Sequence, residues 1–132
     1  MQMTQQYISP DSLFILCIVK EAGYEVREFP ARRWVSTDSV ADNPHDGPES
    51  GETFDLLFQY IAGNNAEGVE IDMTAPVTRL ITPSPVPMEP KAFTESFYIP
   101  AIYQENPVQP IDPLVYIEDR ATFQVTIWLS KN

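Results

Sequence analysis

Residues 49–65, ESGETFDLLFQYIAGNN, contain the clearest helical pattern in the chain. Apolar side chains recur there at positions i, i+3, i+4 and i+7, and so share one helix face: Phe54, Leu57, Phe58 and Ile61. Ser50 or Thr53 can cap the N-terminus, and Gly63 followed by asparagines is typical of a helix end. The stretch therefore predicts one amphipathic helix that buries this face against a sheet.

Two segments before this helix are predicted to be strands, and the first alternates between apolar and polar residues, as half-buried strands do. They are YEVREF (24–29) and RRWVSTDSV (32–40), and Pro30 lies between them. Since a proline interrupts strand pairing, the two segments form either a hairpin or one bent strand.

Strand patterns also follow the helix. We predict a strand from Val69 to Ile81 and a short strand in ESFYIP (95–100), separated by a proline-rich loop. We predict a final hairpin from LVYI (114–117) and TFQVTIWL (122–129), with its turn near residues 118–121. In its second strand, alternate residues share one face: Phe123, Val125, Ile127 and Leu129. Strands, one helix and further strands predict an α+β fold with a mostly antiparallel sheet and the helix on one face.

The stretch IDMTAPVT (71–78) holds a proline inside a predicted strand. Pro76 has no N–H to donate to a neighbouring strand. We therefore expect this strand to lie at a sheet edge or to contain a bulge, where a proline is tolerated.

Composition limits the classes of protein to consider. The chain has 132 residues, of which 43% are hydrophobic, enough for one domain with one core. The net charge is −11, and the eight Lys and Arg residues form no basic run. This charge pattern argues against a nucleic-acid binder and against attachment to anionic lipid.

The N-terminal region holds one apolar run, LFILCIV (13–19). It is shorter than the roughly 20 residues of a membrane-spanning helix. We expect a strand or a packed segment there, with a targeting sequence as the alternative. Cys17 is the one cysteine, so a disulfide within the chain is excluded, and we expect it to be a small buried side chain.

Five stretches in order carry a resemblance to a known family: YEVREFPARRWVST, YIAGNN, IDMTAPVT, SFYIP and VYIEDR. Together they resemble the SOUL haem-binding protein family, most closely its haem-binding protein 2 branch, from about Gly23 to Leu129. The resemblance implies a distorted antiparallel β-barrel of two similar halves flanked by two helices. It also implies reversible, non-covalent binding of haem or other tetrapyrroles in the cytoplasm, with no assigned reaction.

The chain departs from this family pattern in two ways. It ends after the VYIEDR segment, so we expect residues 23–132 to be an incomplete SOUL domain and leave residues 1–22 unassigned. Some family members place a proposed histidine iron ligand directly after the YEVR-like stretch, and Glu28 occupies that position here. The histidine ligand therefore has no counterpart.

The residues offer few candidates for iron ligation or catalysis. His45 is the one histidine and lies in a polar stretch, NPHDGP, so we expect a surface residue rather than an iron ligand. Met73 and Met88 are weaker candidates, in the core and in a loop respectively. We predict that the chain holds no metal site. We also predict that it is not an enzyme, because the sequence shows no nucleophile–histidine–carboxylate arrangement and no phosphate loop.

The resemblance implies that the cofactor site lies on the predicted helix. We assign haem contacts to its apolar face, namely Phe54, Leu57, Phe58 and Ile61, with Arg79 as the cation for the propionates. The other candidate cations are Arg32, Arg33 and Lys91. The alternative is that the helix face only packs on the sheet.

We therefore expect non-covalent haem or tetrapyrrole binding, for buffering or transport. The competing hypothesis is a protein-interaction module of the same fold without the ligand. We also expect self-association through the edge of the incomplete sheet.

Overall fold

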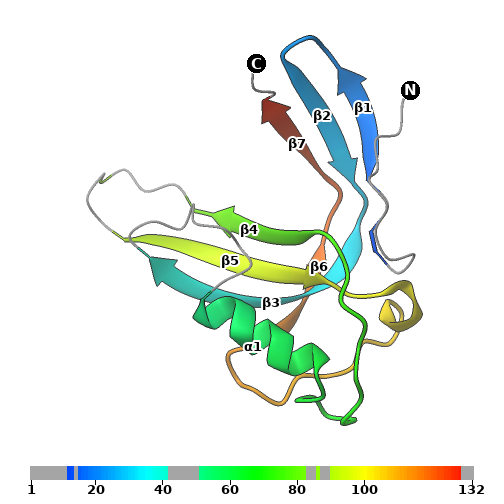
Figure 1. Cartoon of the computed structure of the whole chain (residues 1–132), viewed down its shortest axis with the longest axis vertical. Helices are drawn as coiled ribbons and strands as arrows, with labels where there is room; N and C mark the ends of the chain where they lie inside the picture. The colour runs from blue at the N-terminus through cyan, green and yellow to red at the C-terminus, as the bar shows by residue number, and fades with distance from the viewer. Residues whose placement is uncertain (1–11, 14, 42–50, 83–85, 87–89, 129–132) are drawn as a thin grey trace.

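Two antiparallel sheets and one helix make up the described part of the chain (Figure 1). The structure, a computed structural model, describes residues 12–13, 15–41, 51–82, 86 and 90–128. The three-stranded sheet has the order β1-β2-β7, and the four-stranded sheet has the order β4-β5-β3-β6. The strands are β1 (Leu16–Lys20), β2 (Tyr24–Phe29), β3 (Arg32–Ala41), β4 (Val77–Ile81), β5 (Lys91–Tyr98), β6 (Tyr116–Arg120) and β7 (Phe123–Trp128).

Helix α1 (Glu52–Ile61) and a short 3-10 helix, η1 (Ala101–Tyr103), are the helical elements of the described residues. This arrangement confirms the predicted α+β class with antiparallel sheets, and the described strands do not close into a barrel. No helix of the described residues is long and apolar enough to cross a membrane.

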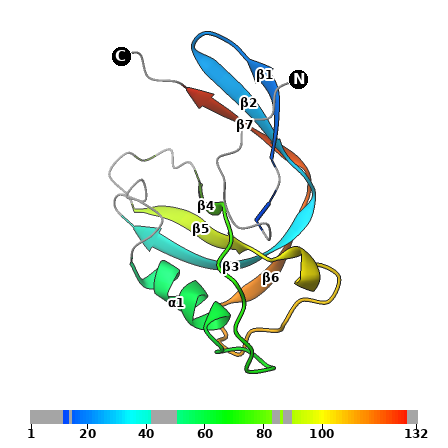
Figure 2. The same cartoon turned by 45° about the vertical axis from the view of Figure 1, so that its right-hand side comes forward.

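The two sheets share a pair of bent strands. β2 pairs with β7 in one sheet, and their continuations β3 and β6 pair in the other. The register runs from Phe29 opposite Phe123 to Arg32 opposite Arg120, so both strands bend at the same level (Figure 2). The prediction that LVYI and TFQVTIWL form a hairpin was therefore wrong. Of the two alternatives for the segments around Pro30, the single bent strand is the one observed.

The strand around Pro76 is shorter than predicted. β4 begins at Val77, and residues 69–76 belong to no strand. The Ala75–Pro76 peptide bond is cis. β4 is the outermost strand of its sheet, which confirms the edge position expected from the proline. β5 begins at Lys91, earlier than the predicted ESFYIP strand.

The main core lies between α1 and the four-stranded sheet. Its buried members come from the helix, both central strands and the loops after them: Val35, Leu57, Tyr60, Ile61, Ile71, Phe97, Ile99, Val108 and Val115. The neighbouring residue on β3, Trp34, faces the other side and packs with Leu13, Phe29 and Tyr98. The helix therefore covers one face of the four-stranded sheet, and the other face is buried beside the bend, whereas Asp38 and Val40 farther along β3 are exposed (Figures 1 and 2).

The buried side of α1 differs from the predicted face. Thr53, Leu57, Tyr60 and Ile61 are the buried residues of the helix, whereas Phe58 is 48% exposed. Tyr60 enters the core because its hydroxyl donates to the Val108 carbonyl oxygen at 2.5 Å. Burial, with the nearby Glu67, raises the pKa of Tyr60 to about 12.

The helix ends are defined by glycines. Gly51 is the N-cap, with φ of 95° and no side-chain cap, so the prediction that Thr53 caps the helix was wrong. Ser50 lies outside the described residues. Gly63 has φ of 124°, a conformation that disfavours other residues, and it follows the C-cap Ala62 as predicted.

The N-terminal apolar run forms part of the fold. Leu13 is buried, and its backbone N–H donates to the Ala75 carbonyl oxygen at 2.9 Å. Cys17 on β1 is also buried, as expected for a small apolar side chain.

The alternation predicted for the last strand is observed in β7: Phe123, Val125 and Ile127 are partly buried, while Gln124, Thr126 and Trp128 are exposed. Leu129 lies outside the described residues.

A buried polar network lies on the four-stranded sheet beside the bend. Arg120 Nη2 donates to Ser96 Oγ at 2.7 Å and Nη1 donates to Thr78 Oγ1 at 3.1 Å. Nε and Nη2 also donate to the Glu118 carboxylate, which accepts a hydrogen bond from Ser36. The guanidinium carbon lies 4.4 Å from the centre of the Trp34 ring. Arg120 on β6 therefore links β4 and β5 through its own hydrogen bonds, and β3 through the bond from Ser36 to Glu118.

Glu118 gives a pH-dependent prediction. Burial alone would raise the pKa of this carboxyl, but the hydrogen bonds from Arg120 and Ser36 lower it below its ordinary value of 4.5. The pKa is lower in the folded than in the unfolded chain, so the ionised pair stabilises the fold above about pH 4.5 and is lost as the pH falls below it.

The matched comparison is Glu118→Gln, which cannot ionise. At pH 7 we expect this variant to be less stable than the wild type by about 1–3 kcal/mol. Urea unfolding at a series of pH values should show this difference shrinking below about pH 4.5. A difference independent of pH would mean that Glu118 does not form this ion pair.

Candidate functional site

The exposed side of α1 carries an aromatic pair. The rings of Phe54 and Phe58 stack with centroids 6.1 Å apart and an interplanar angle of 19°. Phe54 also meets the buried Phe97 ring edge-on at 5.3 Å, which anchors the pair to β5. Because Phe58 remains half exposed, the pair offers an aromatic surface to solvent.

The other two predicted contact residues of the helix lie in the core. Leu57 is 0% exposed and Ile61 is 7% exposed. The predicted set of four is thus divided into a solvent-facing aromatic pair and an aliphatic pair that packs on the sheet. A planar ligand lying on this surface would contact Phe54 and Phe58 first.

Arg79 lies on β4 opposite Glu95 of β5 and forms an ion pair with it. Its Nε donates to Glu95 Oε1 at 3.0 Å, and Thr53 of α1 donates to the same oxygen at 3.1 Å. The guanidinium also lies 4.6 Å above the Phe93 ring. The side chain of Arg79 is therefore held beside the N-terminal turn of α1, where its charge is already paired with the Glu95 carboxylate.

Glu95 is the unexpected member of this group. Its side chain is fully buried, and its Oε2 has no hydrogen-bond partner among the described residues. Burial raises the pKa of this carboxyl, against the lowering effect of Arg79 and Thr53. The sequence carries a signal for it, because Phe93, Glu95 and Phe97 alternate onto one strand face.

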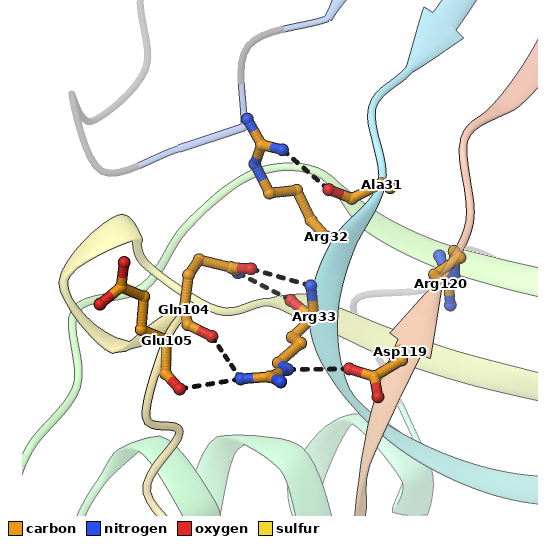
Figure 3. A pocket seen from close by; sticks show the side chains of 7 residues that line it. All are labelled: Ala31, Arg32, Arg33, Gln104, Glu105, Asp119 and Arg120. Atoms are coloured by element: carbon orange, nitrogen blue, oxygen red, sulfur yellow. Dashed lines mark hydrogen bonds and ion pairs between the residues drawn. The ribbon is translucent and has the colours of Figure 1, made fainter.

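The remaining candidate cations are in other places. Arg32 and Arg33 line a pocket of about 560 Å³ at the bend (Figure 3). Lys91 is the first residue of β5. The structure therefore does not bring the four predicted cations together at the helix.

The other predicted positions contribute little. Met73 is 40% exposed in the loop before β4, so the expectation that it packs in the core was wrong. His45 and Met88 lie outside the described residues. Glu28, at the position of the proposed histidine ligand in some family members, lines a second pocket of about 260 Å³ with Leu16, Pro30 and Arg32. A carboxylate at this position is a poor counterpart of an imidazole ligand for haem iron.

The chemistry of the α1 surface favours binding. An aromatic pair can stack on a planar apolar ring. The guanidinium of Arg79 near the start of α1 is paired with the buried Glu95.

Comparisons with known proteins agree on one family. The sequence pattern of the family described as SOUL heme-binding protein matches residues 14–128. Heme-binding protein 2 of Homo sapiens is 36% identical over 104 residues, which cover 79% of this chain and 50% of that protein. Heme-binding protein 2 of Mus musculus gives the same identity and coverage. Heme-binding protein 1 of Sus scrofa is 27% identical over 106 residues, 80% of this chain and 55% of that protein.

The chain thus spans about half the length of the curated relatives it matches. The family match covers most of the described residues, including both sheets and α1. The chain belongs to the SOUL heme-binding protein family.

Proposed function

We propose that this chain binds haem or a related tetrapyrrole reversibly and without a covalent bond, as a cytoplasmic buffer or carrier rather than an enzyme. The observation that carries the proposal is the half-exposed aromatic pair on α1, Phe54 and Phe58. Relatives that share this segment are named as heme-binding proteins. A porphyrin ring lying on this pair would bury apolar surface on both molecules.

The test compares two aromatic truncations in a hemin titration followed by the Soret band. Phe58→Ala should raise the hemin Kd by roughly three- to tenfold, the size expected from one aromatic stacking contact. Trp128→Ala is the matched control, because Trp128 is 77% exposed and lies at the end of β7 remote from α1 (Figures 1 and 2). That variant should bind hemin like the wild type.

The two ways of failing differ. If both variants and the wild type bind hemin equally well, the aromatic pair is not the site. If none of the three changes the hemin spectrum, the binding function itself is refuted and the protein-interaction hypothesis is favoured.

We further propose that the chain self-associates through β7. This strand is outermost in its sheet, and its sequence FQVTIW carries no charge. Proteins that remain monomeric usually carry charged residues on their exposed edge strands. An edge strand without charge can therefore pair with the same strand of a second copy. Pairing of two identical antiparallel strands would bring equivalent side chains close together.

Light scattering after size exclusion measures this association. The wild type should approach twice its monomer mass of 15.0 kDa as the concentration rises. Thr126→Glu, which places like charges on the paired strands, should remain a monomer. A wild type that is monomeric at every concentration would rule out the association.

A further inference from the structure

The pocket at the bend contains a large share of the positive charge of this acidic chain. The chain has eight Lys and Arg residues, and three of them line this one pocket. Its wall is formed by the start of β3, the loop after η1 and the end of β6: Ala31, Arg32, Arg33, Gln104, Glu105, Asp119 and Arg120 (Figure 3).

Arg33 is held in place mainly by neutral groups. Its Nη1 donates to the backbone carbonyl oxygens of Gln104 and Glu105, at 2.8 and 2.9 Å. The Gln104 side chain further fixes the Arg33 backbone, accepting from its N–H and donating to its carbonyl oxygen. Carbonyl oxygens orient a guanidinium without cancelling its charge. Arg33 is therefore an ordered cation, which lowers the entropic cost of binding an anion.

The one carboxylate on Arg33 is weakly bound. Asp119 Oδ1 lies 2.8 Å from Arg33 Nε, but the two side chains are 80% and 39% exposed. An exposed ion pair of this kind contributes about 0–1 kcal/mol. An incoming anion can therefore share or replace Asp119 at little cost.

Arg32 has no carboxylate partner among the described residues. Its Nη1 donates to the Ala31 carbonyl oxygen at 2.7 Å, and the side chain is exposed. Figure 3 shows Arg32 and Arg33 leaving β3 in different directions, with Gln104 and Glu105 on one side of Arg33 and Asp119 on the other. Arg32 also lines the smaller pocket with Glu28 and with Leu16 and Pro30, which supply apolar surface beside its charge.

The third arginine has a structural role. Arg120 is bound to Glu118, Ser96 and Thr78 and is nearly buried. Arg79, the cation assigned from the sequence, is likewise matched by the buried Glu95. Arg32 and Arg33 are thus better placed than Arg79 or Arg120 to bind an external anion.

We infer that the pocket at the bend binds the oxyanion group, carboxylate or phosphate, of a small organic anion. Arg33 is its fixed cation and Arg32 is the cation that closes on the ligand. Guanidinium groups match both oxyanions through paired N–H donors. The oxyanion belongs either to a propionate of the proposed tetrapyrrole or to a separate metabolite.

The first arm of the test uses inorganic phosphate and the NMR signals of the backbone amides of Arg32, Arg33, Gln104 and Glu105. Phosphate should shift these signals in a saturable way. Arg32→Gln should raise the phosphate Kd by roughly fivefold, and Arg32→Lys should recover part of the loss. Lys20→Gln, an exposed charge removal at the end of β1, should leave the Kd unchanged. Shifts that do not saturate, or equal effects of Arg32→Gln and Lys20→Gln, would overturn the inference.

The second arm identifies the source of the oxyanion and is the only one that rests on the proposed haem binding. It compares hemin with hemin dimethyl ester, in which both propionates are neutral. If the pocket binds a propionate, Arg32→Gln raises the Kd for hemin by roughly fivefold and leaves the Kd for the ester unchanged. If the pocket binds a separate anion, Arg32→Gln changes neither the Kd for hemin nor the Kd for the ester, while phosphate still binds. A wild type that binds phosphate but not hemin would refute the proposed function and keep the anion site.

Discussion

Arg120→Ala is expected to lower the free energy of unfolding by about 3–5 kcal/mol. The side chain of Arg120 is 7% exposed, and its guanidinium satisfies Glu118, Ser96 and Thr78 at the bend between the sheets. Removing it leaves a partly buried carboxylate and a buried hydroxyl without their cationic partner. The variant also loses the contact with the Trp34 ring.

Urea unfolding followed by tryptophan fluorescence measures this loss. Arg32→Ala is the matched control, since it removes an exposed arginine of β3 that pairs directly opposite Arg120, and it should change stability by less than about 0.5 kcal/mol. Combining Arg120→Met with Glu118→Gln should cost less than the sum of the single changes, because no unpaired charge remains. A loss under about 1 kcal/mol in Arg120→Ala would show that the polar network does not stabilise the bend.

Leu57→Ala is expected to cost about 2–5 kcal/mol. Leu57 is fully buried at the centre of the contact between α1 and the sheet, in the same cluster as Val35 and Phe97. Truncation leaves a cavity that the rigid sheet cannot fill. Phe58→Ala, on the exposed side of the same helix, should cost much less, about 1 kcal/mol or below.

The same denaturant titration distinguishes the two roles of the helix face. A Leu57→Ala loss well under 1 kcal/mol would mean that the face is not packed on the sheet. Leu57 would then be available to a ligand, as assigned from the sequence. A loss of the expected size restricts direct ligand contacts on α1 to the aromatic pair.

Local patterns explain what the sequence predicted of the fold. The 3.6-residue period of residues 52–61 and the alternation in residues 24–29 depend only on neighbouring positions, and both elements are where the patterns place them. The buried side of α1 was misassigned because counting apolar residues favours Phe58 over Tyr60. Tyr60 is buried through a hydrogen bond to Val108, 48 positions away, which no local pattern contains.

The strand connections show the same limit. An interruption between two strands looks alike in sequence whether the chain reverses or bends. The EDRA segment predicts a turn from its sequence, yet the strand continues there because β2 and β3 bend at the same level opposite it. The information that decides between the two lies in the partner strand.

The candidate site was predicted only in part. The aromatic residues of α1 follow from the helical period, but the pairing of Arg79 with Glu95 depends on the register of β4 against β5. The pocket at the bend joins three segments, two of them about 70 and 86 residues from Arg33, so no motif marks it.

The central claim is that this chain binds a tetrapyrrole reversibly, and hemin titration of the unmodified protein tests it most directly. The account predicts a saturable change in the Soret band, reversed when an excess of a tighter haem-binding protein is added. His45→Ala should give the same spectrum and affinity, because the proposed contacts include no histidine. The claim would be contradicted if hemin gave the same spectrum with the protein, at every protein concentration, as it gives in buffer alone.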